Sequence, residues 1–228
     1  MIKKVFLSLA LVAAAATASA QDWPQFLGPT ADSKSPQTNL LREWPAAGPE
    51  VVWTTDVGIG YGGPVVQNGK VYLLDRNHET EEEIMRSFDL KTGKELWRLT
   101  TNQAVMGAAT IHEGVAYIGG GDGRMFAIDI HTGMVKWSFD ELKNYVLTRP
   151  LVYGDKLYFG CWDTHFYALN LNDGSLVWKW NNGKGNPKLS PASVWPVAAN
   201  GKIFITAPDR YFTCLDAETG AEVWRTNQ

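Results

Sequence analysis

The sequence of 228 residues offers few groups whose type and spacing suit metal binding or catalysis. Its four histidines, His78, His112, His131 and His165, do not have the spacing of zinc ligands. Residues 81–83 are three consecutive glutamates whose side chains diverge, whereas calcium needs about six to eight converging oxygens. We therefore expect no metal site and assign no catalytic residue.

Motifs for nucleophilic and phosphate chemistry are also lacking. The sequence has no Gly-x-Ser-x-Gly turn, and the glycine-rich residues 119–123 read as a strand-end loop because no helical pattern follows them. Cys161 and Cys214 are the two cysteines, and whether they form a disulfide is left open. The net charge of -3, without a clustered basic stretch, argues against nucleic acid as a partner.

The N-terminus has the features of a secretory signal peptide. Two lysines precede an apolar run over residues 5–16, and Ala18-Ser19-Ala20 suits a signal peptidase. We predict a signal peptide over residues 1–20, cleaved after Ala20, and a periplasmic or secreted mature protein. Gln21 stands where a lipoprotein would have its cysteine, and no apolar run approaches the ~20 residues of a membrane span.

Residues 21–50 form a second region, rich in proline, glycine, serine and threonine without helical or strand periodicity. Tryptophans at positions 23 and 44 are of little use to a flexible linker. We therefore predict an irregular N-terminal arm that lies on the surface of the domain that follows it.

From residue 51 onward the sequence repeats with a period near 43 residues, which indicates propeller blades. Each repeat ends in an Asp or Asn, a Gly four residues later and a Trp four residues after that. These motif residues are Asp89, Gly93 and Trp97; Asp129, Gly133 and Trp137; Asn170, Gly174 and Trp178; and Asp216, Gly220 and Trp224. We expect the Asp and Gly to form a turn and the Trp to pack against the neighbouring blade, all in structural roles.

Each repeat also reads as four antiparallel strands. Turn pairs such as Asn68-Gly69 and Asn200-Gly201 lie between apolar runs, and no helical period intervenes. We predict an all-β protein, a β-propeller of four-stranded antiparallel blades over residues 51–228. The blades are expected at roughly 62–98, 106–138, 148–179 and 193–225, and the first has five extra residues in its loop between the second and third strands.

The spacing Ala-x-Asp-x-x-Thr-Gly-x-x-x-Trp resembles the tryptophan-docking motif of the pyrroloquinoline-quinone-like (PQQ-like) β-propeller repeat. This repeat occurs in quinoprotein alcohol dehydrogenases and in the propeller lipoprotein of the β-barrel assembly machinery. The resemblance covers residues 51–224, and the start of the arm, Asp22-Trp23-Pro24-Gln25-Phe26-Leu27-Gly28-Pro29, looks like that of secreted bacterial propellers of this type. The resemblance implies the fold, and a fold does not fix a function.

The resemblance also implies a test for a cofactor. Quinoprotein dehydrogenases of this family commonly place a disulfide between adjacent cysteines against the quinone, bind calcium and use an aspartate as base. Adjacent cysteines are absent here, so we expect no cofactor. PQQ with calcium, near Arg149 and Trp195, belongs to the alternative interpretation, a quinoprotein dehydrogenase for alcohols or sugars or a piece of one.

Loops at one end of the blades carry the residue types that dominate interface energies, namely Trp, Tyr and Arg. Our candidate contact residues are Tyr61, Met106, Arg149, Trp162, His165, Trp195, Asp209 and Arg210. They favour a non-catalytic binding or scaffold module for a protein, peptide or saccharide in the cell envelope. The competing interpretation is structural, with aspartates that form turns and an arginine paired with a neighbouring carboxylate.

Residues 51–55 resemble the fourth strand of a blade whose other three strands do not precede it. Four repeats are also fewer than the about seven or eight blades of quinoprotein-type rings. We therefore predict an incomplete, open ring that a second copy or a partner chain completes.

Overall fold

The computed structural model describes residues 22–24, 27–30, 32–38, 42–60, 63–101, 105 and 107–227. The predicted signal peptide over residues 1–20 lies outside this part of the chain. Within it, the helical structure is one 3-10 turn, η1 (Pro187–Leu189), and no helix is long and apolar enough to cross a membrane.

The strands form four antiparallel sheets, each with its four strands in chain order. The first sheet contains β1 (Val65–Gln67), β2 (Lys70–Arg76), β3 (Glu83–Asp89) and β4 (Glu95–Thr101), and the second contains β5 (Thr110–His112), β6 (Val115–Gly119), β7 (Met125–Asp129) and β8 (Val135–Phe139). The third contains β9 (Leu151–Tyr153), β10 (Lys156–Gly160), β11 (His165–Asn170) and β12 (Leu176–Asn181), and the fourth contains β13 (Val197–Ala199), β14 (Lys202–Thr206), β15 (Tyr211–Asp216) and β16 (Glu222–Asn227). The predicted all-β architecture of four-stranded blades is confirmed.

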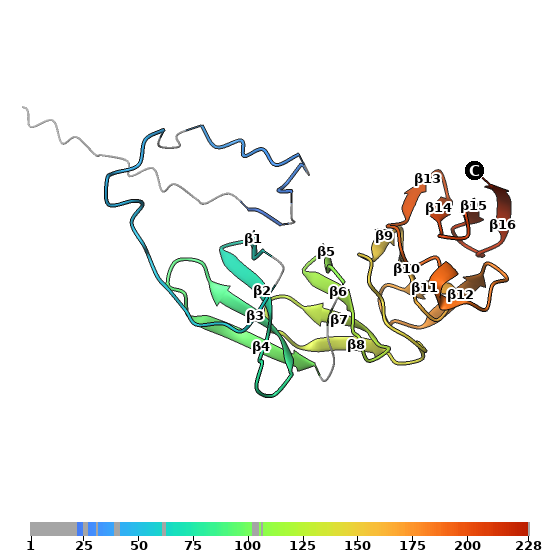
Figure 1. Cartoon of the computed structure of the whole chain (residues 1–228), viewed down its shortest axis with the longest axis horizontal. Coiled ribbons are helices and arrows are strands. Elements are labelled where there is room, and N and C mark those ends of the chain that lie inside the picture. Colours follow the sequence, from blue (N-terminus) through green and yellow to red (C-terminus); the bar gives the residue numbers. More distant parts are fainter. Residues whose placement is uncertain are drawn as a thin grey trace, which may run out of the picture.

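The four sheets follow one another along an arc (Figure 1). Their short first strands lie on the concave side, and their fourth strands lie on the convex side. Tight turns fix each hairpin between the first two strands, with positive φ at Asn68 (52°) and Gly69 (71°) and again at Asn200 (51°) and Gly201 (71°). These are the φ values that such turn pairs favour.

The apolar core lies in the layers between neighbouring sheets. Tyr72 and Trp97 of the first sheet pack with Ile118 and Phe126 of the second, and similar clusters join the second to the third and the third to the fourth. The second and third strands are the most buried, and Tyr158 of β10 is fully buried. Each layer is therefore a separate small core, as in other repeat architectures.

Residues 51–55 do not form the expected strand. In the described part of the chain no strand pairs with them, and Val51 and Val52 are about three-quarters exposed, at 74% and 75%. Trp53 nevertheless lies against the first sheet, stacked on Phe88 with ring centroids 6.4 Å apart. The arm also contacts this sheet, through a β-bridge between Trp23 and Val66.

The extra residues of the first repeat lengthen its central hairpin as well as its loop. β2 and β3 each have seven residues, against five in β6 and β7. The buried Asp75 of β2 accepts hydrogen bonds from the Arg86 guanidinium at 2.8 Å and from the Gly58 amide at 2.5 Å. Of the three consecutive glutamates, Glu83 begins β3, with its carboxylate 3.8 Å from the Arg76 guanidinium.

Candidate binding surface

Three motif tryptophans, Trp97, Trp137 and Trp178, join their own sheet to the turn between the third and fourth strands of the next sheet, and Trp53 docks on the first sheet in the same way. In each case the indole N–H donates to the carbonyl of the residue after the motif Asp or Asn. The bonds run from Trp53 to Leu90 at 2.8 Å, from Trp97 to Ile130 at 3.0 Å, from Trp137 to Leu171 at 3.1 Å and from Trp178 to Ala217 at 3.0 Å. Trp53 thus makes the docking contact without belonging to a strand.

The motif turn itself is closed by its aspartate. Asp129 accepts hydrogen bonds from the amides of His131 and Thr132, each at 2.9 Å, and from the Thr132 hydroxyl at 3.1 Å. The bond from the Thr132 amide is the main reason that the pKa of Asp129 lies below its usual range. The carboxylate is thus an anion held within the turn, which is a structural role.

The opposite end of the sheets carries the loops between second and third strands and the segments that connect the sheets. Asp163, between β10 and β11, holds such a pair of loops together. Its carboxylate is 3% exposed and accepts from the Lys143 amide at 3.1 Å, the Tyr167 hydroxyl at 2.7 Å and the His165 amide at 3.1 Å. Burial and the bond to Asp163 raise the pKa of Tyr167, so its hydroxyl remains a donor at neutral pH.

Trp162 lies within this pair of loops and is only partly exposed. Its ring packs against Tyr145 with centroids 5.5 Å apart, and its amide donates to the Tyr145 carbonyl at 3.1 Å. The Asn144 side chain donates to the Trp162 carbonyl at 3.4 Å. Among the described residues the buried Trp162 Nε1 has no hydrogen-bond partner. The predicted contact residue therefore packs mainly against its own chain.

Asp209, between β14 and β15, plays the same part in the fourth sheet. Its carboxylate is 2% exposed and accepts from the Arg225 guanidinium and, at 2.9 Å, from the Asn182 side chain. The Arg225 guanidinium lies 4.3 Å from the Tyr211 ring centroid and donates to the Asn182 carbonyl at 3.1 Å. This buried ion pair joins the last strand to the segment after β12.

The remaining candidates differ in exposure. Trp195, between the third and fourth sheets, is 60% exposed, and Arg210 is exposed with a φ of 70°. Arg149 lies just before β9, and its Nε donates to the Thr110 hydroxyl of β5 at 3.1 Å. His165 is 31% exposed, with Nδ1 3.1 Å from the Asp163 carbonyl.

The structure brings His165, Trp162 and the segment around Tyr145 together, and it brings Arg210 to the turn of Asp209. The candidates Tyr61 and Met106 lie outside the described residues. Among the described candidates the exposed ones are Trp195, before β13, and Arg210, between β14 and β15.

Sequence reasoning missed Arg225, Asn182 and Tyr145. Arg225 directly follows a motif tryptophan, at a position where the other repeats have Arg98, Ser138 and Lys179, so the repeat gave no signal for its buried ion pair. The other two lie in connecting segments of irregular length, which cannot be aligned between repeats.

The described residues do not fit a PQQ and calcium site. In the described ranges no group of three or more His, Cys, Asp or Glu side chains converges, and the Asp163 and Asp209 carboxylates already accept bonds from the protein. Cys161, directly after β10, and Cys214, in β15, are both buried free thiols in different repeats. Burial raises the pKa of Cys161 to about 12, so its thiol stays protonated and unreactive at neutral pH.

Fold, docking tryptophans and repeat spacing together define a β-propeller of the PQQ-like repeat class, which confirms the resemblance noted from the motif. The family model described as outer membrane protein assembly factor BamB matches residues 41–186 and 167–228. The chain belongs to this family.

Relatives of two kinds match the chain. BamB of Yersinia pestis is 25% identical over 194 residues, which cover 78% of this chain and 48% of that protein. A quinoprotein ethanol dehydrogenase of Pseudomonas aeruginosa is 28% identical over 135 residues, which cover 51% of this chain and 22% of the enzyme. The solved structure of BamB from Moraxella catarrhalis superposes with a TM-score of 0.55 at 23% identity, covering 72% of this chain and 47% of that one. The chain spans at most about half the length of these relatives.

Proposed function

We propose that this chain is a non-catalytic propeller module that binds a protein or peptide partner in the cell envelope. The observation that carries the proposal is the difference between the acidic side chains and the exposed side chains in the loops at one end of the sheets. The Asp163 and Asp209 carboxylates accept hydrogen bonds from within the protein. Trp195 and Arg210, by contrast, are exposed. A large exposed aromatic ring and an arginine suit partner binding better than chemistry.

The matched family supports a protein partner over a saccharide, because its description is that of an outer membrane protein assembly factor. A periplasmic location agrees with the signal peptide predicted over residues 1–20. BamB of Yersinia pestis and BamB of Escherichia coli share 25% and 28% identity with this chain, so the particular partner is not carried over from them.

Site-specific photocrosslinking tests the proposal. A crosslinking residue in place of Trp195 should capture a component of outer-membrane protein assembly in intact cells. The same residue in place of Met134, which is 69% exposed at the other end of the sheets, is the matched control. Equal capture from both positions, or none from position 195, would contradict the proposed surface.

The second candidate is a quinoprotein dehydrogenase, or part of one, for alcohols or sugars. It is favoured by the 28% identity to the ethanol dehydrogenase, and it is opposed by the misfit of the described residues to PQQ and calcium. Purified protein supplied with PQQ and calcium decides between the two: saturable dye-linked oxidation of an alcohol or sugar would overturn the binding module.

A further inference from the structure

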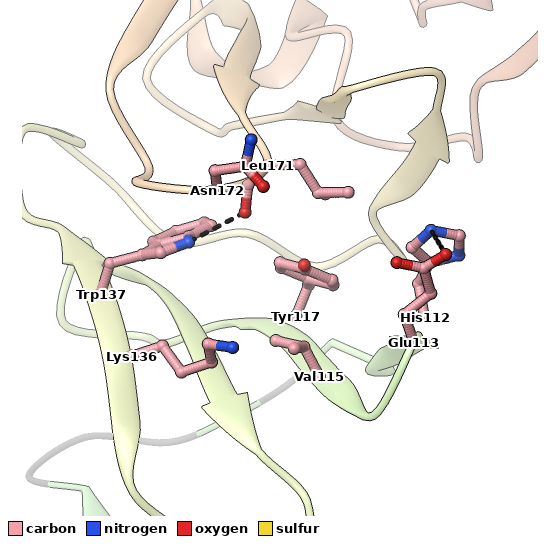
Figure 2. A pocket seen from close by; sticks show the side chains of 8 residues that line it. All are labelled: His112, Glu113, Val115, Tyr117, Lys136, Trp137, Leu171 and Asn172. Atoms are coloured by element: carbon pink, nitrogen blue, oxygen red, sulfur yellow. Dashed lines mark hydrogen bonds and ion pairs between the residues drawn. The ribbon is translucent and has the colours of Figure 1, made fainter.

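A cavity of about 150 Å³ opens between the second and third sheets (Figure 2). It lies at the turn between β5 and β6 and the motif turn of the third sheet, which is the end of the sheets away from the Trp195 segment. One wall of the cavity is formed by residues of the second sheet, Val115, Tyr117 and Trp137. Asn172, in the motif turn of the third sheet, lines the opposite wall. Figure 2 shows the dashed bond from the Trp137 indole to the Leu171 carbonyl beside the cavity.

A comparison of the repeats explains why this space is open. Val115 pairs with the motif aspartate across the hairpin, and the residues in the same register of the other sheets are Lys70, Lys156 and Lys202. Val115 is therefore the exception, and the stem and ammonium group of a lysine are absent from this one layer.

The lysines of the first and third sheets show what such a side chain does there. Lys70 Nζ lies 3.0 Å from Nδ1 of His131, and Lys156 Nζ donates to the Glu218 carboxylate at 2.8 Å. His131 and Glu218 occupy the same place in their turns, two residues after the motif aspartate. In the turn of the third sheet that place belongs to Asn172, whose side-chain oxygen is an acceptor.

The groups around the open space suit a cation with an apolar stem. The aromatic rings of Tyr117 and Trp137, with centroids 5.8 Å apart, form an apolar surface against which an alkyl stem can pack. Among the described residues no hydrogen bond is made by the Tyr117 hydroxyl, and in Tyr158 the same group donates to the Ala217 carbonyl at 3.1 Å. The Glu113 side chain also lines the cavity, and its negative charge contributes, after burial, to the raised pKa of Tyr117.

Two other basic side chains lie at the rim of the cavity. His112 lies beside Glu113, with Nε2 and Oε1 4.0 Å apart. Lys136 is exposed on β8, at the position that Leu96 and Val177 hold in neighbouring sheets. Its long stem lets the ammonium turn out to solvent, and its proximity makes it a competitor for any cation that enters.

We propose that this cavity binds a primary ammonium group on an alkyl stem, the lysine side chain of a peptide, in the place that Lys70 and Lys156 fill in the neighbouring layers. The site lies at the other end of the sheets from the proposed partner surface and does not depend on it.

The probe is Nα-acetyl-lysine-N-methylamide, followed by NMR through the Trp137 indole and Asn172 amide signals. We expect saturable shifts, and binding at least ~10-fold weaker for the neutral norleucine analogue. Butylammonium, which has the ammonium group and the alkyl stem without a peptide backbone, is compared with the lysine probe. The lysine probe should bind more tightly than butylammonium if the site takes a lysine within a peptide. Equal binding of the lysine and norleucine probes, tighter binding of propionate, or no saturable shift overturns the proposal.

Variants of the protein sharpen the test. Val115→Lys should fill the cavity from within, abolish probe binding and raise the melting temperature, and Lys136→Met should strengthen probe binding several-fold. If V115K does not fold, Val115→Met, which fills the same space without charge, must abolish binding instead. Retained binding in the filled variant, or weaker binding in K136M, contradicts the site.

Discussion

The indole N–H of Trp178 donates to the backbone carbonyl of Ala217 at 3.0 Å, and the same ring covers Gly220 of the fourth sheet. Trp178 is 8% exposed, whereas Trp224, its counterpart in the last sheet, is 41% exposed. One tryptophan thus joins two sheets, and the other lies on an outer face. The same residue in the same repeat position has two different energetic roles.

Replacing Trp178 with alanine should lower the free energy of unfolding by about 3–5 kcal/mol, because a buried ring and an inter-sheet hydrogen bond are lost. Trp224→Ala removes a half-exposed ring that packs on Phe212 and should cost about 1 kcal/mol. Urea unfolding followed by circular dichroism measures both. Similar losses in the two variants would show that docking on the next sheet contributes little.

Gly174→Ala should be more destabilising than Gly154→Ala. Both glycines have positive φ, 73° and 62°, which costs an alanine about 1–2 kcal/mol. A Cβ at position 174 would lie 2.5 Å from the Trp137 ring, while one at position 154 would meet nothing within 4 Å. Thermal melts of the two variants isolate the contact with the tryptophan, and equal melting temperatures would contradict it.

Much of this fold was predictable because the repeat encodes it locally. The turn pairs and the motif tryptophans reveal strand order and blade contacts, since each works through neighbours at a fixed spacing. Residues 51–55 were predicted wrongly as a strand, because the pattern of β-branched residues and tryptophan is present while, among the described residues, no neighbouring strand pairs with them. A strand is a property of two chain segments, and the pattern reports only one of them.

The candidate surface was less predictable because its contacts are not encoded locally by the repeat. The exposure of Trp195 follows from no repeat signal, and Trp162, of the same residue type, packs against Tyr145. Arg225 and Asp209 come together from positions 16 residues apart, with no pattern to relate them. Contacts made by connecting segments depend on tertiary structure that the spacing of residues does not record.

The stability of the protein should fall as the pH rises above 9, in part because of Cys161. Folding raises the pKa of this thiol from 9.0 to about 12, so its contribution is complete below pH 9 and is lost between pH 9 and 12. At pH 10 the loss should be about 1.4 kcal/mol. Cys161→Ala should flatten the dependence of unfolding free energy on pH between 8.5 and 10. Burial also raises the pKa of Cys214, so a smaller slope should remain.

Arg225→Ala should destabilise the protein by about 3 kcal/mol, because it leaves the buried Asp209 carboxylate without its cation. Arg210→Ala is the matched control, since this neighbouring arginine is exposed and its loss should change stability by about 0.5 kcal/mol or less. Chemical denaturation gives both values. An Arg225 variant as stable as the Arg210 variant would rule out a structural role for the ion pair.

We expect two copies of the protein to associate through the outer face of the fourth sheet, which exposes Val223 and Trp224 at 47% and 41%. Light scattering at micromolar concentration should give the mass of a dimer. Trp224→Glu should yield a monomer, and Met134→Glu, at another exposed position, should not. A monomeric unaltered protein would contradict this expectation.

The place of Trp53 has a consequence for assembly. Its ring already covers Gly93, the turn on which the Trp224 of another molecule would have to dock in a head-to-tail contact. Head-to-tail contacts between identical arcs that do not close would propagate into filaments. Because Trp53 covers this acceptor turn from within its own chain, head-to-tail addition of further copies is blocked, and a single indole ring prevents growth into fibres. Association is then limited to contacts such as those between the outer faces of two fourth sheets.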